Sequence, residues 1–492
     1  MSGFMNILRS PGAREEVKGV APTQQLDALQ DDGISDSKAV NAGYTTQEKQ
    51  RRLDRWLDWV VHMSGSASVF LVILAGLLTW ALVGIKYHNV LDWQIIISDV
   101  QAILSYLFDS LLMRQQLNSY ATSLDVCAQL LSRASSNNRM LAALVAKFDE
   151  TDLKYLTVLS EQFQGDGFES ELPKESWYGQ ISTFCSEVLG HILFVAVFWI
   201  SIVIWLAFGP ANGWSDAWQL DMNSATSAVM VLVFSFLANI RELHHDYSLK
   251  CLQATFRVDS ALEGKLRLLT GDSLENDIVV IDAPKTSPVQ RVINYYADVV
   301  GTLVGIAILI VVTVVWIAIG PVMHFSSNWW LIIGTYAGLV GLNDGFVLRN
   351  VQARLNDHEL LEFAKIDTHD AVMFETINMP IRPKDFTDRR TITYRVSTVM
   401  KNICAHEITV VIGFLFIVSL LCGESAMGWN TTGQLLCNVP HSVVETFLMV
   451  ILLTGHNFSE ARRRADLRAI YERRLKLFAF VNTVQTSARK VE

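Results

Sequence analysis

Long apolar segments recur along the chain in four pairs, and a short turn separates the two segments of each pair. Each segment has about 20 residues and almost no charge, which is enough to cross ~30 Å of hydrocarbon at 1.5 Å per residue. The pattern predicts eight transmembrane helices, grouped as four helical hairpins. The expected spans are 61–85, 91–113, 184–208, 217–238, 296–320, 328–347, 403–422 and 435–455.

A common motif marks the turns of the first three hairpins. A Trp-x-x-x-Gly ends the first apolar segment, and a second Trp follows nine residues after the glycine. The three copies are Trp80 to Gly84 with Trp93, Trp205 to Gly209 with Trp218, and Trp316 to Gly320 with Trp329. A weaker fourth copy runs from Ser419 to Gly423 and is followed by Gly433-Gln434. The recurrence predicts that the hairpins are internal repeats of one unit.

The Lys and Arg residues lie on one side of the predicted hairpins. Eight of the 40 precede residue 56, nine follow residue 461, and the rest lie in the connections 114–178, 241–291 and 349–401, apart from Lys86. Cytoplasmic segments carry the excess of positive charge, so both termini and all three connections are expected in the cytosol. Every hairpin then starts and ends inside, which gives the repeats a parallel topology.

The long connections contain apolar residues at helical spacing among charges, which predicts helical extensions into the cytosol. The first 50 residues have no apolar core segment and are expected to form a disordered cytosolic tail. The expected organisation is a tail 1–50, hairpins 51–113, 178–240, 291–348 and 395–457, cytosolic loops 114–177, 241–290 and 349–394, and a basic cytosolic tail 458–492.

The composition agrees with an all-α membrane protein. Hydrophobic residues make up 51% of the 492 residues and charged residues only 18%, which places the lipid bilayer as the chain's solvent. The net charge of -9 gives no basic face for nucleic acid. The sequence has no P-loop, zinc-finger spacing or catalytic triad pattern, so an enzyme is not expected. Cys422 and Cys437 border the fourth external turn and are the one cysteine pair placed for a disulfide.

Ionisable side chains inside a membrane span are costly, so they should face the bundle interior and are candidates for function. Gln101, Ser105 and Asp109 follow one another at four-residue intervals and share a helix face. His441 and Glu445 have the same spacing, and alignment on the turn motif places them opposite Gln101 and Ser105. The candidate ligands within the membrane are Asp99, Gln101, Asp109, Asp344, His441 and Glu445.

Three further candidates mark the inner ends of the spans. His62, Glu187 and Asp298 each lie 18 residues before the first Trp of their repeat, where the fourth repeat has Lys401. These positions predict a cytoplasmic mouth. The run His244-His245-Asp246 could also receive an ion, although adjacent helical residues point about 100° apart, which favours a surface role.

Imidazole, carboxylate and amide oxygen together suit borderline divalent ions such as Fe(II), Zn(II), Mn(II) and Cu(II). Weak ligands at several depths favour transit over trapping, because an ion must be able to leave. The alternative for each residue is a hydrogen bond between helices, and this alternative is strongest for Gln101 and Ser105. The leading ligand candidates are His441 and Glu445.

Several segments resemble the fungal low-affinity iron permease family. They are Ser64-Gly65-Ser66, Trp93 to Tyr106, Asp109 to Gln116, Gly209-Pro210 with Trp218-Gln219, and Gly320-Pro321 with Trp329-Trp330. The resemblance covers most of residues 50–480 and is most specific in the first hairpin. It implies a multi-pass plasma-membrane transporter of Fe(II) that discriminates little against other divalent metals, without a resident cofactor. Ser419 and Lys401 depart from the pattern of the other repeats, so four equivalent ligand sets are not expected.

Two other functions fit the same sequence pattern. A non-selective ion channel would share the polar-lined bundle. A membrane scaffold or metal sensor would use the long cytosolic helices and transport nothing. Uptake of metal into cells that lack other iron importers would separate the three.

Overall fold

The computed structural model describes residues 12–24, 43–44, 51–88, 90–162, 167–381 and 392–491. One order of elements occurs four times within these ranges: a 13-residue helix, an apolar helix, a short turn and a very long helix. The 13-residue helices are α2 (Arg52–Ser64), α6 (Trp177–Leu189), α9 (Pro288–Val300) and α12 (Ile392–Cys404). The apolar helices are α3 (Ala67–Tyr87), α7 (Ile192–Phe208), α10 (Leu303–Ile319) and α13 (Glu407–Ala426). The long helices are α4 (Leu91–Val145), α8 (Asp216–Thr270), α11 (Ser327–Thr376) and α14 (Thr431–Val491).

The remaining elements are short. They are β1 (Val17–Gly19), α5 (Glu150–Gln162), the 3-10 helix η2 (Pro210–Asn212) and β2 (Val279–Ile281). The two strands pair antiparallel, with Lys18 opposite Val280.

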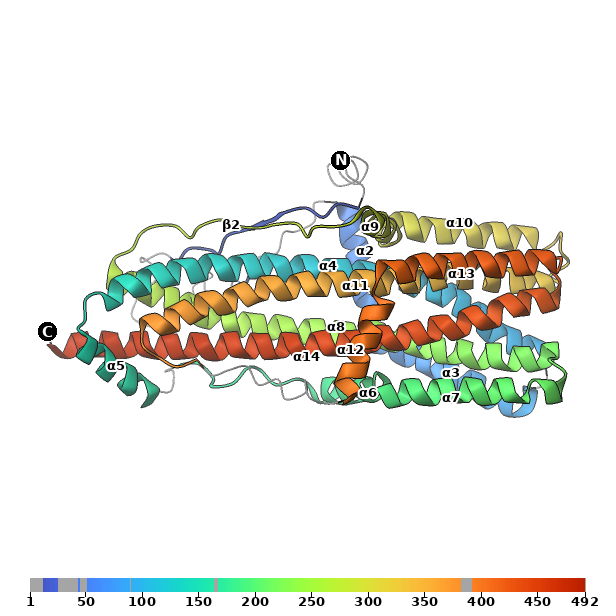
Figure 1. Ribbon diagram of the computed structural model, residues 1–492, viewed down its shortest axis with the longest axis horizontal. Helices are drawn as coiled ribbons and strands as arrows, with labels where there is room; N and C mark the ends of the chain where they lie inside the picture. Colours follow the sequence, from blue (N-terminus) through green and yellow to red (C-terminus); the bar gives the residue numbers. More distant parts are fainter. Residues whose placement is uncertain are drawn as a thin grey trace.

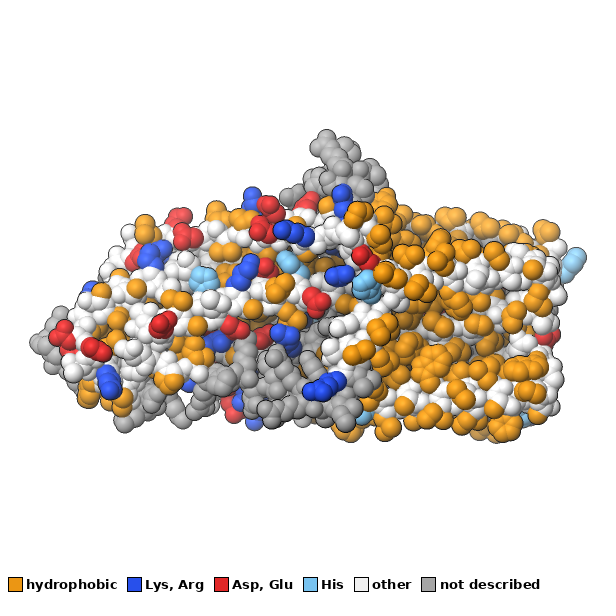
Figure 2. All heavy atoms as spheres, viewed as in Figure 1, with side chains coloured by type: hydrophobic (Ala, Val, Ile, Leu, Met, Phe, Trp, Pro, Cys, Tyr) orange, Lys and Arg blue, Asp and Glu red, His pale blue; other side chains and the backbone are white. Residues whose placement is uncertain are grey.

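The four long helices form a bundle that runs the whole length of the molecule in one direction (Figure 1). The helices α3, α7, α10 and α13 lie beside one end of this bundle. We call these four helices, together with the end of the bundle that they flank, the apolar half. Figure 2 shows hydrophobic side chains over that half and charged side chains over the rest, which we call the polar half. The predicted helical extensions are confirmed as helices, because each long helix continues unbroken from the apolar into the polar half.

Apolar side chains of all four long helices pack together along the bundle. Leu112, Phe234, Leu342 and Met449 belong to one buried cluster. A second cluster in the polar half includes Leu262, Phe374 and Phe480. The long helices therefore form the framework on which the shorter ones lie.

The first helix of each predicted hairpin is interrupted, and the prediction of a single uninterrupted span is wrong there. A new helix begins after Ser66, His191, Thr302 and His406, and the side chain of each accepts a hydrogen bond from a backbone N–H in the first turn of that helix. Such caps satisfy N–H groups that have no partner within the helix and so favour a fresh helix start. The 13-residue helices precede these breaks in the chain, and the predicted spans had included their last residues.

Six helices among the described residues are long and apolar enough to cross a membrane, namely α3, α4, α8, α11, α13 and α14. The pairs α6 with α7 and α9 with α10 qualify only together, and they bend by 50° and 66° at their breaks. The chain is thus a multi-pass, all-α membrane protein.

Part of the N-terminal tail is ordered, and the prediction of disorder is wrong for residues 12–24. Strand β1 lies in this segment, Ala21 is only 1% exposed, and Arg14 forms a 2.6 Å ion pair with Asp298 of α9. The backbone pairing and the ion pair hold the segment against the polar half. The remaining residues predicted as tail, apart from 43–44, lie outside the described residues.

The proposed disulfide is also wrong. Cys422 and Cys437 are both free thiols, the first exposed and the second buried.

Candidate functional site

Three carboxylates from three of the long helices meet inside the apolar half. Asp109 on α4, Asp344 on α11 and Glu445 on α14 are fully buried, and Asp109 interacts electrostatically with both other acids. A Cβ at Gly341 of α11 would lie 2.6 Å from Oε1 of Glu445 and 3.4 Å from Oδ2 of Asp109, so both acids face this glycine. The Tyr296 hydroxyl donates a 2.6 Å hydrogen bond to Oδ1 of Asp344. We call these three acids the central carboxylates.

The central carboxylates have little compensation from the protein. Among the described residues, neither oxygen of Asp109 or Glu445 accepts a hydrogen bond, and Oδ2 of Asp344 accepts none. An isolated ionised carboxylate is very costly to bury, so such a group must be neutralised by protons or by a cation. The arrangement is suited to a cation that enters and leaves.

His441 lies one helical turn from Glu445 on α14, toward the short turns. Its Nδ1 donates to the backbone carbonyl of Cys437 at 3.0 Å, and a carbonyl can only accept. In the neutral ring the other nitrogen, Nε2, then carries the lone pair, and it points toward Gly338 of α11, where an added Cβ would lie 1.8 Å away. A second bond that fixes the orientation of the ring is typical of a metal-ligating histidine.

The two other candidate ligands on α4, Gln101 and Asp99, differ in their hydrogen bonding. Gln101 donates to Oγ of Ser105 on the same helix at 2.7 Å. It also accepts from Ser227 of α8 at 3.3 Å, and this bond is the interhelical contact weighed as its alternative role. Asp99 is buried, and its Oδ2 has no hydrogen-bond partner among the described residues.

Two buried arginines lie on the polar side of the central carboxylates, and the sequence analysis missed them. Arg241 of α8 donates to the Leu112 carbonyl at 3.4 Å, and Arg349 of α11 donates to Gln352 at 2.7 Å. Their Nε and Nη2 atoms find no acceptor among the described residues. Arg349 follows Asp344 by five residues, about 7.5 Å along the helix. Both positions had been taken as the first residue of a cytosolic loop, so their burial was not anticipated.

Beyond the arginines a cavity of about 710 Å³ opens at the boundary of the two halves. Its lining includes His62, Gln115, Arg241, Glu242, Asp246 and His456. Polar groups from α2, α4, α8 and α14 therefore surround one volume.

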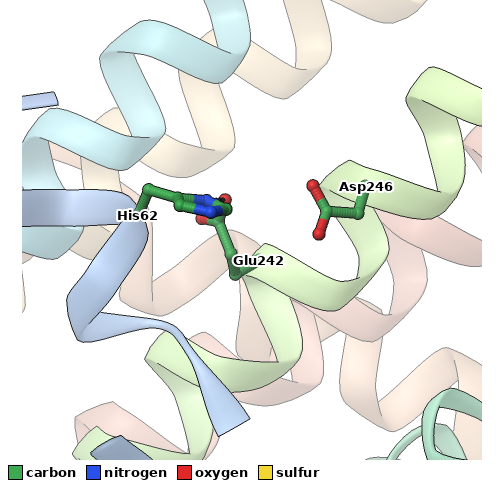
Figure 3. A group of neighbouring side chains, drawn as sticks. All are labelled: His62, Glu242 and Asp246. Atoms are coloured by element: carbon green, nitrogen blue, oxygen red, sulfur yellow. Dashed lines mark hydrogen bonds and ion pairs between the residues drawn. The ribbon is translucent and has the colours of Figure 1, made fainter. Parts of the chain in front are cut away.

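Within this cavity His62 of α2 meets Glu242 and Asp246 of α8 (Figure 3). One potential ligand atom from each residue lies within 4.8 Å of the others. The Nδ1 atom of His62 is 2.5 Å from Oε1 of Glu242, and Gln115 donates to Oε2 of Glu242 at 2.9 Å. Sequence reasoning had identified His62 and the run at Asp246 separately, but it had no means of placing α2 against α8.

The other two predicted mouth residues do not join His62. Glu187 is exposed on α6, and Asp298 of α9 is paired with Arg14. Equivalent positions on α2, α6 and α9 lie on separate short helices around the bundle, so their side chains do not converge. His244, the first residue of the run that ends at Asp246, is buried and hydrogen-bonds His456 at 2.9 Å.

The fold and these buried groups define a multi-pass helical membrane protein with carboxylate and imidazole side chains buried along its axis. The chain belongs to the low-affinity iron permease family, whose sequence model matches residues 178–248, 289–367 and 393–487. The matched ranges cover the second, third and fourth predicted hairpins and parts of the segments that follow them. They do not include the first hairpin, where the resemblance had been considered most specific.

Two characterised relatives are similar over nearly the whole chain. The low-affinity iron/zinc ion transport protein of Schizosaccharomyces pombe is 35% identical over 96% of this chain and 84% of its own. The low-affinity Fe(2+) transport protein of Saccharomyces cerevisiae is 31% identical over 98% of both chains. No solved structure matches this chain.

Proposed function

We propose that the protein transports Fe(II) with low affinity across the plasma membrane, and that it also accepts other divalent transition metals. Both relatives are named as low-affinity transporters, one of iron and zinc and the other of Fe(II). The observation that carries the proposal is the group of three buried carboxylates without compensating charge, with the free Nε2 of His441 one turn away. Carboxylate oxygen and imidazole nitrogen are ligands that such ions share.

The ion's path follows the axis of the four long helices. An ion entering from the turn side passes Asp99 and Gln101, meets Nε2 of His441 and then the central carboxylates. The glycines Gly338 and Gly341 keep α11 close to these groups without filling the space between them. Ligands at successive depths allow the ion to move from one group to the next and prevent it from being trapped.

Exit toward the polar half requires the guanidinium groups of Arg241 and Arg349 to move aside. Both are positively charged, and they lie between the central carboxylates and the cavity, so they repel a divalent cation. We infer that the described conformation is closed on the polar side and that transport alternates with a conformation in which this barrier is displaced.

For the topology we propose eight spans in four parallel hairpins, in which each bent pair counts as one span and the polar half lies in the cytosol. The distribution of Lys and Arg supports this orientation. Single cysteines at positions 88, 213, 325 and 430 should react with an impermeant thiol reagent on intact cells. If cysteines within 349–401 were labelled and those in the turns were not, the proposed orientation would be wrong.

Uptake of radioactive Fe(II) by cells that lack other iron importers tests the transport function itself. We expect saturable uptake that Zn(II) and Mn(II) inhibit competitively. Uptake that rises linearly with concentration would favour the channel alternative. A protein that reaches the cell surface and moves no metal would favour the scaffold or sensor.

A further inference from the structure

We propose that His62, Glu242 and Asp246 form a second binding site for a divalent transition metal, at the polar-side cavity. Its place as the last stop of the ion before release rests on the proposed transport function, whereas metal binding at this site does not. The ligand set is separate from the central carboxylates, because Arg241 and Arg349 lie between the two groups.

The site is built by the first break in the chain. A Cβ at Gly65, the residue after α2, would lie 2.8 Å from Cβ of Glu242 and 2.9 Å from the carbonyl oxygen of Ala238. Asn239 donates a 2.8 Å hydrogen bond to the carbonyl of Gly65. This close approach fixes the end of α2 on α8 and places the imidazole of His62 over Glu242.

The two carboxylates come from one face of α8. Glu242 and Asp246 are four residues apart, so their side chains point the same way. Glu242 is 8% exposed, and the amide of Gln115 holds its second oxygen, which leaves Oε1 facing the imidazole. His62 and Asp246 are exposed to the cavity. An ion at this point would meet one fixed carboxylate and two side chains that can adjust.

The local charge favours a cation. An imidazole that ligates a metal must be neutral, and with His62 in that form the two carboxylates give the site a net charge of two negative units. Neither carboxylate has a Lys or Arg partner among the described residues. Arg463 also lines the cavity, but it forms a bidentate pair with Glu359, with a shortest distance of 2.8 Å. Arg241 points toward the Leu112 carbonyl of α4.

The chemistry of the ligands indicates the class of ion. One imidazole and two carboxylates suit Fe(II), Mn(II), Co(II) and Zn(II). Three protein ligands with the remaining positions open to water are typical of an exchangeable ion, whereas structural zinc sites use four protein ligands. The cavity supplies the water and the way out.

Titration of the purified full-length protein with Co(II), followed by visible absorption, tests the site. His62→Gln and Asp246→Asn should each weaken one class of Co(II) binding about tenfold or more, as changes around metal sites commonly do. Asp125→Asn is the matched control, because Asp125 lines the same cavity but does not belong to the group. Since Asp246 is exposed, its replacement should not disturb folding.

Asp246→Cys gives a direct spectroscopic test. A thiolate ligand should add a sulfur-to-Co(II) charge-transfer band in the near ultraviolet, and Asp125→Cys should add none. Equal Co(II) affinity in His62→Gln, Asp246→Asn and the parent, together with no such band in Asp246→Cys, would overturn the proposal.

The two proposals fail in different ways. If Glu445→Gln removes Co(II) binding at the central carboxylates and blocks uptake while the signal that depends on Asp246 persists, both proposals stand. If the His62 and Asp246 variants bind Co(II) as the parent does but uptake still depends on Glu445, only the proposal of the second site is wrong. If the Asp246 signal persists while no metal is transported, the site is a metal site and its role in release is wrong.

Discussion

The same four helices bury acidic side chains in both halves of the molecule but treat them in opposite ways. In the polar half, Asp259, Glu263 and Asp370 are fully buried, and each has an arginine partner. Arg474 lies 2.9 Å from Asp259 and 2.8 Å from Asp370, and Arg133 lies 2.8 Å from Glu263. In the apolar half, the central carboxylates have no such partner among the described residues.

This difference separates the ion-paired framework of the polar half from the proposed metal pathway in the apolar half. Where the chain provides its own counter-charges, the acids are part of a fixed ion-pair network that holds the polar half together. Where it provides none, the counter-charge must come from outside, as a proton or a metal ion. The predictions below test this distinction, beginning with the largest expected effect.

The first prediction concerns the uncompensated acids. Glu445→Gln should reduce Fe(II) uptake by about tenfold or more while surface abundance stays near normal, because the change removes a ligand charge and almost no volume. His441→Ala and Asp109→Asn should act in the same direction. Saturation curves for uptake, normalised to surface protein, measure the effect.

Trp218→Phe is the control for that series, since Trp218 stacks on Trp205 near the turn and away from the carboxylates. It should transport almost normally. If Glu445→Gln transports at the parental rate and half-saturation, Glu445 is structural.

The second prediction concerns the compensated acids. Arg474→Met should leave Asp259 and Asp370 buried without this partner and destabilise the protein by about 3–5 kcal/mol. Lower thermal stability in detergent and lower cellular abundance should follow. Arg468→Met, which removes an exposed pair with Glu472, should change the stability by less than about 1 kcal/mol. Equal loss in the two variants would remove the distinction between the halves.

The third prediction concerns the space around the central carboxylates. Gly341→Ala places a methyl group 2.6 Å from Oε1 of Glu445, so the carboxyl group must move. We expect uptake to fall several-fold with little loss of thermal stability. Gly345→Ala lies one turn away, where the methyl group meets the flexible end of Met449 at 3.2 Å, and it should transport more nearly as the parent does. The reverse order of the two variants would contradict the placement of Glu445.

The smallest expected effect is a pH dependence in the polar half. Partial burial opposes ionisation of Asp272, but hydrogen bonds from Arg139 and the Leu274 backbone N–H outweigh it and lower the pKa. The stability from this group is present above the ordinary aspartate pKa and is lost as the pH falls through the lowered value. Asp272→Asn should therefore flatten the acid side of a thermal-stability profile slightly. An unchanged profile would show that the partly buried pair of Asp272 and Arg139 contributes nothing measurable.

The sequence carried enough information to find the apolar segments and the buried acids but not their register. Counting from the turn motif placed Glu445 opposite Ser105, whereas the structure brings it to Asp109, one helical turn deeper. The turns that precede the long helices differ in length and conformation, so distance from a motif does not give depth in the bundle. Apolar patterning indicated that Asp344 and Asp109 were buried, and this prediction is confirmed by their full burial.

The breaks and the arginines could not be found by the same reasoning. A hydropathy average extends smoothly across Gly65 and Ser66, while the break depends on a single capping hydrogen bond and a close contact with α8. Arg241 and Arg349 resemble ordinary charges at the ends of spans. Their burial follows from the continuation of all four long helices as one bundle, which no single segment reveals.

The buried arginines also suggest a physical reason for low affinity in the proposed metal pathway. Each guanidinium lies at the end of a flexible side chain, one or two helical turns from the central carboxylates. It can therefore compete with a metal ion for the carboxylate oxygen atoms. Groups held by short links compete at effective concentrations of about millimolar. A metal ion would have to displace the guanidinium groups to bind the carboxylates, and these groups would return when the ion leaves. Low affinity would then follow from two competing cations, Arg241 and Arg349, that are part of the pathway itself.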